Sequence, residues 1–229
     1  SVSLSHALFN TGAIVPVEEI GKILSEKNIP YFVDAAQTVG CISDVDVNKI
    51  NCNFMSFNGS KWLCGPMGMG IFYCRKDSSE LIEPLQIGGE SAIFHEDKIA
   101  HKEMPARFQA GFRNWSGAAG LEASIIYLKK IGIPAIRERN IKLAELLRQE
   151  ISKISGAILY GPEEKERRTS IVSFSIQDQD SKTLVARLEK NNIILAVRDI
   201  FSKKIVRASP HFYNTESEIH AVIDTIKKG

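Results

Sequence analysis

Short apolar runs alternate with an amphipathic helical pattern over roughly the first third of the chain, and this alternation constrains the fold more than any other feature. The apolar runs predict four strands, Val2–Ser5, Tyr31–Val33, Phe54–Phe57 and Gly70–Tyr73. Between the first two, Pro16 to Glu26 is predicted to form a helix, with Pro16 in its first turn and an apolar stripe along one face. Because a helix between two strands is a crossover connection, the strands are expected to run mostly parallel in an α/β fold.

The rest of the chain predicts a second, smaller unit. Residues 76–115 are rich in turn residues and carry little periodicity, so we expect functional loops there. Helices are predicted at residues 116–130 and, after a break at Gly132 and Pro134, at residues 136–154. Beyond Gly156 the pattern predicts strands at 157–160, 170–176, 193–197 and 204–208 and helices at 182–190 and 216–227. We therefore expect residues 1–131 to belong to a large α/β domain and residues 132–229 to form a linker helix and a small α+β carboxy-terminal domain.

The composition is that of a soluble globular protein, with 44% hydrophobic and 24% charged residues and a formal net charge of +2. No apolar stretch approaches the roughly 20 residues of a membrane-spanning helix, and no basic stripe could follow a phosphate backbone. We therefore expect neither a membrane nor a nucleic acid as a partner. The cysteines lack CxxC and disulfide spacing, which favours a cytoplasmic location and gives no metal site. All four lie in apolar contexts and are expected to be buried, inert thiols: Cys41, Cys52, Cys64 and Cys74.

Polar side chains follow two of the predicted strands, where open α/β sheets bind their ligands. Asp34 and Gln37 come after the second strand, and Asn58, Ser60 and Lys61 come after the third. A pyridine cofactor that acts as an electron sink needs a carboxylate for its ring nitrogen, an amine for an imine and donors for a phosphate. These residues could supply all three, although an Asp at a strand end is often a cap and a lone Lys is usually solvated.

Five motifs occur in an order that resembles one enzyme family. They are Ser-His-x-x-x-x-Thr-Gly (residues 5–12), Val-Asp-x-x-Gln (33–37), Gly-x-Lys-Trp-Leu-x-Gly-Pro-x-Gly (59–68), Arg-Phe-x-x-Gly (107–111) and Arg-x-Ser-Pro-His-Phe-Tyr-Asn-Thr (207–215). Together they resemble the class V aminotransferases, which are fold type I enzymes dependent on pyridoxal 5′-phosphate (PLP). The resemblance covers essentially the whole chain, so that residues 1–131 would be the later half of the PLP-binding large domain.

The resemblance implies a role for each residue of the cofactor set. Lys61 matches the Schiff-base lysine, which also moves protons during catalysis. Asp34 matches the partner of the pyridinium nitrogen, and Gln37 matches the residue near the phenolic oxygen. Asn58 and Ser60 stand in the turn that contacts the phosphate.

Three further residues are less determined by the motifs. Arg207 matches the arginine that pairs with a substrate α-carboxylate, a task suited to a bidentate guanidinium. His6 either contacts the cofactor or caps a loop. Arg198 either recognises an acidic side chain of the substrate or is a solvated surface residue.

The implied function is a PLP-dependent enzyme that acts on an α-amino acid through an external aldimine, as in proteins similar to isopenicillin-N epimerase. Transferase, epimerase and lyase chemistry all remain open. Cysteine desulfurase or selenocysteine lyase activity is an alternative, but residues 193–207 lack the cysteine that desulfurases carry there. A non-catalytic scaffold with the same fold is another alternative.

The resemblance also implies a homodimer, with the active site near the subunit boundary. Phe112 and Trp115, in the loop around Gly111, would give that loop an apolar contact surface. The chain begins in a predicted strand without an initiator Met or a signal peptide, and we interpret it as a fragment.

Overall fold

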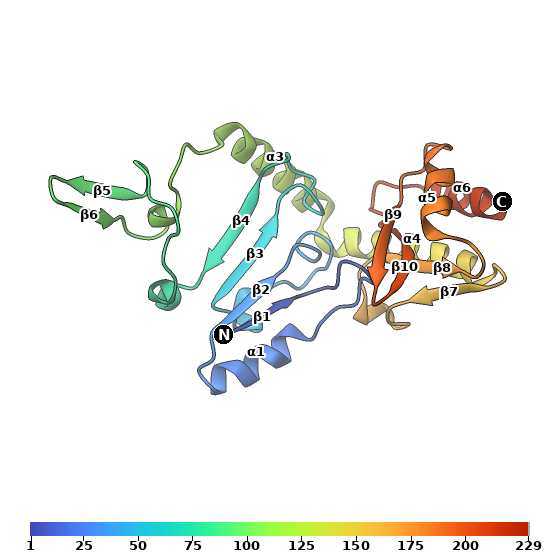
Figure 1. Ribbon diagram of the computed structural model, residues 1–229, viewed down its shortest axis with the longest axis horizontal. Coiled ribbons are helices and arrows are strands. Elements are labelled where there is room, and N and C mark those ends of the chain that lie inside the picture. Colours follow the sequence, from blue (N-terminus) through green and yellow to red (C-terminus); the bar gives the residue numbers. More distant parts are fainter. Residues whose placement is uncertain (229) are drawn as a thin grey trace.

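The computed structural model describes residues 1–228, which form two four-stranded sheets joined by two long helices (Figure 1). The first sheet has the order β1-β2-β3-β4, made of Val2–Ser5, Tyr31–Asp34, Phe54–Asn58 and Gly70–Cys74. Strands β1, β2 and β3 run parallel, and β4 is antiparallel to β3. The residues between β3 and β4 are too few for a crossover helix, so the chain must turn back on itself. The predicted α/β class with a mostly parallel sheet is confirmed.

Two helices lie in the connections of this sheet, α1 (Val17–Glu26) and the short α2 (Val47–Ile50). Pro16 was predicted to lie in the first turn of α1, but it precedes the helix as its N-cap. A proline has no N–H to donate and suits either position, because the first helical N–H groups lack partners in any case. The helices enclose an apolar core whose largest members are Tyr31, Ile50 and Met55.

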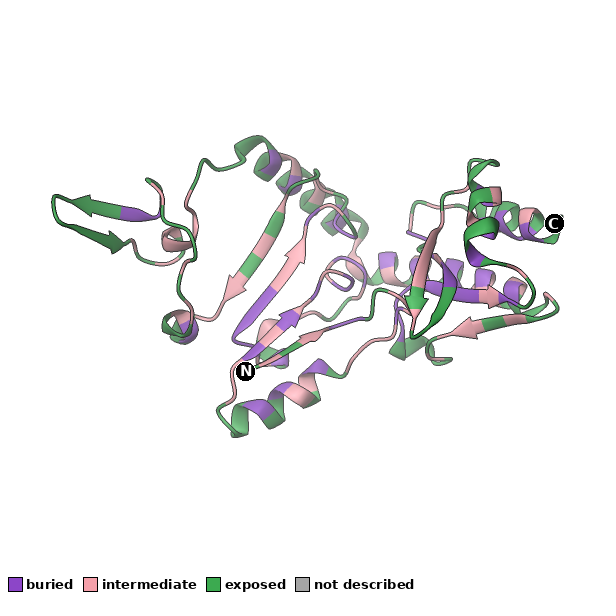
Figure 2. Ribbon diagram, viewed as in Figure 1, coloured by how far each residue is buried: buried purple, intermediate pink, exposed green. Residues whose placement is uncertain are grey.

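The region expected to form only loops contains a β-hairpin. Short 3₁₀ helices at Lys76–Leu81 and Ala106–Phe108 flank β5 (Ala92–His95) and β6 (Lys98–His101). The hairpin extends away from both sheets and is mostly exposed (Figures 1 and 2). Sequence periodicity missed it because Ala92 is the one buried residue of the two strands, and so apolar and polar residues do not alternate.

Helices α3 (Trp115–Ile131) and α4 (Ile133–Ser152) connect the two sheets. Only Gly132 separates them, with a φ of +92°. Pro134 lies in the first turn of α4 and does not break it, so this helix begins three residues before the predicted Ile136. The buried side of α4 packs against the second sheet through Leu147 and Ile151, among others.

The second sheet is entirely antiparallel, with the order β7-β8-β10-β9. Its strands are Ala157–Tyr160, Val172–Ile176, Lys203–Ala208 and Ala196–Ile200 in that order. A 3₁₀ turn at Lys165–Arg167 and helices α5 (Ser181–Glu189) and α6 (Glu216–Lys227) complete this part. Thr215 caps α6 in a reciprocal capping box with Glu218. Strand β9 begins at Ala196, and the prediction of 193–197 was displaced by three residues.

The segment after β1 contacts the second sheet and ties the two parts together. The Thr169 N–H donates to the Gly12 carbonyl over 2.8 Å, and the Ser173 hydroxyl donates to the Asn10 carbonyl over 2.5 Å. Gly12 has a φ of +74°, and a Cβ there would lie 2.7 Å from Thr169 Oγ1. Glycine is therefore required at the closest approach. The result is that β10 faces the loops that follow β1, β2 and β3.

No helix within residues 1–228 is long and apolar enough to cross a membrane. The proposed domain boundary at residues 131–132 coincides with the junction between α3 and α4, and it stays a prediction.

Candidate active site

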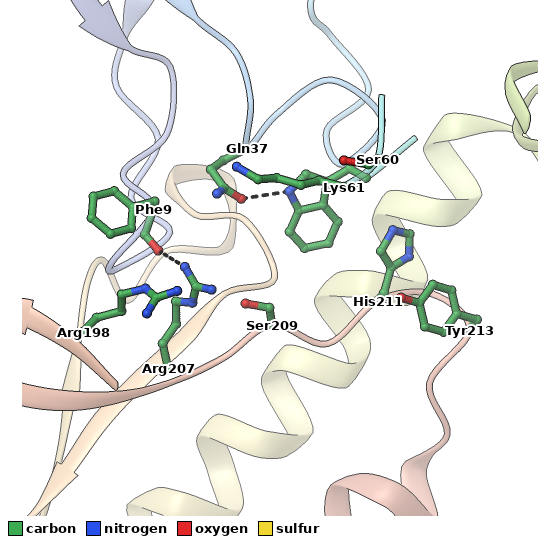
Figure 3. A pocket seen from close by; sticks show the side chains of 10 residues that line it. Phe9, Gln37, Ser60, Lys61, Arg198, Arg207, Ser209, His211 and Tyr213 are labelled. Carbon is green, nitrogen blue, oxygen red and sulfur yellow. Dashed lines mark hydrogen bonds between the residues drawn. The ribbon is translucent and has the colours of Figure 1, made fainter. Parts of the chain in front are cut away.

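A cavity of about 600 Å³ lies between the loops of the first sheet and the strands β9 and β10 (Figure 3). One side is lined by Phe9, Gln37, Ser60, Lys61 and Trp62, and the other by Arg198, Arg207, Ser209, His211 and Tyr213. The fold thus brings four predicted site residues to one place, namely Gln37, Ser60, Lys61 and Arg207. The predicted residues Asp34, Asn58 and His6 do not line this cavity.

Lys61 lies in the tight connection from β3 to β4. The Gly59 N–H donates to the Met69 carbonyl over 2.9 Å, and the Gly65 N–H donates to the Gly59 carbonyl over 2.8 Å. The two residues after Lys61, Trp62 and Leu63, are buried, whereas Lys61 itself is exposed towards the cavity. The backbone of the lysine is therefore held firmly while its amine stays accessible.

Gln37 is buried beneath the cavity and is fixed by Trp62. The indole Nε1–H of Trp62 donates to Gln37 Oε1 over 3.0 Å. With its oxygen occupied in this way, Gln37 has its amide N–H groups available to donate. Trp62 stands beside Lys61 in its motif, but the motif does not indicate the bond to Gln37, which is 25 residues away.

His211 forms part of the cavity wall through aromatic stacking. Its ring stacks on Trp62 with centroids 4.9 Å apart and on Tyr213 with centroids 4.6 Å apart. Burial lowers the pKa of His211 to about 4, so the ring is neutral at pH 7. Its Nδ1 accepts from the Phe212 N–H over 2.9 Å, which leaves the proton on Nε2. The packing of these three rings shapes the wall of the cavity.

Asp34 and Asn58 end the neighbouring strands β2 and β3. Asp34 Oδ1 accepts the Ala36 N–H over 2.9 Å, which holds the carboxylate in an Asx turn. The Asn58 Oδ1 atom is buried and has no hydrogen-bond partner within the described residues. Each side chain is thus positioned by a strand end, and the role predicted for each remains untested.

His6 is buried and directly follows β1. Its Nδ1 lies 3.1 Å from the Thr38 hydroxyl, which also donates to the Ala35 carbonyl. Burial lowers the pKa of His6 to about 4. The residue lines a separate hollow together with Glu19 and Asp44. Of its two possible roles, the geometry favours holding the loop after β2.

Arg207 and Arg198 project from the adjacent strands β10 and β9. Arg207 Nη1 donates to the Phe9 carbonyl over 3.0 Å, and its buried Nε has no partner within the described residues. Burial lowers the pKa of Arg207 below its usual range, and the positive charge of Arg198 contributes a smaller shift in the same direction. A guanidinium beside another guanidinium and without a carboxylate partner is suited to binding an anion.

The prediction that all four cysteines are buried is wrong for two of them. Cys41 and Cys52 are buried, but Cys64 is exposed and Cys74 is intermediate. Cys64 has a φ of +55° in the turn after Leu63, which directs it away from the apolar core. Its sulfur lies 3.7 Å from His211 Nε2 at the edge of the site, and desolvation raises the pKa of the thiol.

Solved structures of the same fold define the class of protein. The apo structure of a cysteine desulfurase from Thermococcus onnurineus NA1 superposes with a TM-score of 0.94 at 30% identity, over 99% of this chain and 59% of that one. The Escherichia coli cysteine desulfurase CsdA superposes with a TM-score of 0.91 at 22% identity, over 99% of this chain and 58% of that one, which supports the fold alone. The predicted fold type I of PLP-dependent enzymes is confirmed.

The family follows from the sequence match. The model of the family described as aminotransferase class-V matches residues 1–222, and the chain belongs to this family. A probable cysteine desulfurase of Methanothermobacter thermautotrophicus is 34% identical over 99% of this chain and 60% of its own length. One from Pyrococcus abyssi is 32% identical over 99% of this chain and 59% of its own length. The chain therefore spans about three-fifths of the length of these curated relatives.

Proposed function

We propose that the protein is a PLP-dependent enzyme that acts on an α-amino acid. The observation that carries this proposal is that the Lys61 amine and the Arg207 guanidinium line the same cavity, on opposite sides. An amine and a carboxylate-binding group that face one cavity suit a substrate whose own amine and carboxylate share one carbon. The family match supports the same cofactor and substrate class.

The residues of the cavity fit the cofactor. No Asp or Glu lines the cavity within residues 1–228, whereas Lys61, Arg198 and Arg207 do, so the charge is suited to a phosphate and a carboxylate. Ser60 supplies a hydroxyl for a phosphate oxygen. The orphaned Arg207 Nε is a buried donor that still needs a partner. Asp34, held at the end of β2, is the carboxylate proposed for the ring nitrogen.

When bound, PLP supplies an electron sink that stabilises negative charge on the carbon next to the substrate amine. Arg207 binds and orients the substrate carboxylate, which places that carbon near Lys61. Lys61 Nζ accepts the proton from this carbon and returns it, so it acts as general base and acid. Gln37 donates from its amide to an acceptor on the cofactor, and Trp62 keeps Gln37 in place.

The type of reaction is proposed separately from the cofactor and the substrate class. We propose transamination, epimerisation or elimination by the proton transfers of Lys61, as in proteins similar to isopenicillin-N epimerase. The connection between β9 and β10 contains only Phe201 and Ser202, and no cysteine is present there. A persulfide route through this hairpin therefore has no nucleophile.

Cysteine desulfurase activity is the second candidate, and the names of the relatives favour it. Cys64 is the residue that such a reaction would have to use, because it is exposed and contacts His211 at the cavity wall. Its raised pKa argues against a thiolate at neutral pH.

We propose a cytoplasmic homodimer as the working form. The apolar side chains of Phe94, Ile99, Phe112 and Trp115 are exposed, the first two on the hairpin, Phe112 in the loop before α3 and Trp115 at the start of α3. Exposed apolar side chains grouped on neighbouring segments are typical of interaction surfaces. Sedimentation of the full-length protein should report a dimer, and Phe112→Ser should weaken it.

The function is tested with full-length protein, PLP and a panel of L- and D-amino acids, with and without a keto acid. Product analysis should reveal a keto acid, an inverted amino acid or an elimination product. Release of sulfide from cysteine, lost in Cys64→Ser, would favour the second candidate instead. A protein that binds no PLP and converts none of the amino acids would refute both.

A further inference from the structure

The cavity holds one more cation than the proposed reaction uses. Lys61 serves the cofactor and Arg207 serves the substrate carboxylate, but Arg198 has no assigned partner. It also lines the cavity, and Figure 3 shows its side chain beside that of Arg207. The side chain of Arg198 makes one hydrogen bond to the protein within the described residues, from Nη1 to the Val197 carbonyl over 2.7 Å.

The strand register explains why Arg198 faces the cavity. Arg198 pairs with Ile205, and Arg207 pairs with Ala196, so the two arginines are diagonal neighbours across β9 and β10. Side chains at such positions share a face of the sheet, and such diagonal neighbours lie about 7–8 Å apart. Two anionic groups of a single small molecule can contact two guanidinium groups at this spacing.

No acidic side chain among residues 1–228 forms an ion pair with either arginine. Asp199 follows Arg198 and therefore points to the opposite face of β9, where it forms an ion pair with Lys204 over 2.7 Å. Two adjacent cations in a partly desolvated cavity repel each other, and an anionic ligand removes this repulsion.

Arg198 also lies within a strand. Its strand is joined to β10 by a two-residue connection, so the guanidinium is carried by a short hairpin and not by a long loop. Binding groups carried by strands are placed more precisely than groups on loops. Arg198 is therefore suited to choosing among substrates by geometry as well as by charge.

We propose that Arg198 binds a second anionic group of the substrate, so that the enzyme prefers α-amino acids with an acidic side chain over their uncharged analogues. This inference rests on the proposed function, in which Arg207 binds the α-carboxylate. The substrate class is thus a four- or five-carbon amino dicarboxylate, or an amino acid with an equivalent acidic group.

The test compares matched pairs of substrates on the full-length enzyme with PLP. Aspartate is compared with asparagine and glutamate with glutamine, on the unaltered enzyme, on Arg198→Gln and on the control Lys203→Gln. Lys203 lies on β10 and is exposed outside the cavity. The unaltered enzyme and the control should favour the acidic member of a pair in kcat/KM by about tenfold or more.

In Arg198→Gln this preference should disappear, mainly through a higher KM for the acidic substrate, while kcat/KM for the amide substrate stays within about threefold. Succinate should inhibit the unaltered enzyme more strongly than succinamate, and Arg198→Gln should remove that difference.

Two results would overturn the inference while leaving the proposed function intact. One is turnover of neutral amino acids with no preference for acidic ones. The other is a loss of PLP affinity and of turnover for every substrate in Arg198→Gln, which would place Arg198 on the cofactor phosphate. If the unaltered enzyme converts no amino acid at all, the proposed function itself fails and this inference with it.

Discussion

Trp62 donates its indole N–H to the side-chain oxygen of Gln37 over 3.0 Å, and this bond joins the residue after Lys61 to the loop after β2. Both partners are buried. A buried hydrogen bond of this kind contributes about 1 kcal/mol, and leaving one partner unsatisfied costs about 1–3 kcal/mol. This bond therefore holds the loop after β2 against the loop after β3, next to Lys61.

Lys61 is the residue on which the proposed chemistry depends. Borohydride reduction of the PLP-loaded protein, followed by peptide mapping, should find the pyridoxyl group on Lys61. Lys61→Ala should lower turnover by roughly 10²–10⁴-fold, the usual contribution of a positioned acid and base. Lys22→Ala, on the exposed side of α1, is the matched control and should leave turnover unchanged. A label on any other lysine would refute the assignment.

Asp34→Asn should lower turnover by about 100-fold or more while leaving PLP bound, because an uncharged partner no longer keeps the ring nitrogen protonated. The asparagine keeps the oxygen that accepts the Ala36 N–H, so the Asx turn should persist. Spectral titration with PLP measures binding, and steady-state kinetics measures turnover. Near-normal turnover would show that Asp34 is only a cap.

Strong periodicity explains which parts of the fold were predictable. The bounds of β1 and α6 are as predicted, since each has a clear apolar pattern. Strand β9 was displaced because Ile193, Ile194 and Leu195 form the most apolar run, although Ile194 is 85% exposed. Pairing with β10 selects instead the more polar residues that include Arg198 and Asp199. Tertiary pairing therefore overrode local hydrophobicity.

Site residues that belong to a sequence motif were predictable. Contacts between residues far apart in the sequence were not. Gln37, Ser60, Lys61 and Arg207 were found from motifs, and all four line the cavity. The stack of His211 on Trp62 joins residues far apart in the sequence, and neither residue type signals such a contact by itself. Contacts of this kind depend on how the second sheet approaches the first.

Arg207→Ala should raise KM for the amino acid with a smaller effect on kcat. Truncating one partner of a desolvated charge pair costs roughly 2–5 kcal/mol, which corresponds to about 30-fold or more in affinity. Arg207→Lys should recover only part of this loss, because an ammonium lacks the bidentate geometry. Arg167→Ala, at an exposed position of the 3₁₀ turn, is the control. An unchanged KM in Arg207→Ala would contradict the proposed role.

Cys64→Ser should leave turnover of amino acids without sulfur within about twofold, because it is a small change at an exposed position that has no role in the proposed proton transfers. Mass spectrometry of the unaltered protein after incubation with cysteine should find no persulfide on Cys64, because the raised pKa keeps its thiol protonated at neutral pH. Cys74→Ser provides a matched control at a second partly accessible thiol. A persulfide on Cys64 would instead establish the desulfurase alternative.

Acidification should destabilise the fold through His6 and His211, whose pKa values burial lowers to about 4. In the unfolded chain both imidazoles regain a pKa near 6.5, so between these values the unfolded state binds more protons. The free energy of unfolding should therefore fall as pH drops from about 6.5 towards 4. At pH 5 the loss should reach roughly 2 kcal/mol for each histidine, as an upper bound.

Urea unfolding of the apoprotein at pH 7.5 and pH 5.0 measures this loss. His6→Gln should remove about half of the pH dependence, because only His211 then titrates in this way. His95→Gln serves as the control, since His95 lies exposed on β5. Equal pH dependence in all three proteins would show that His6 is not held neutral by burial.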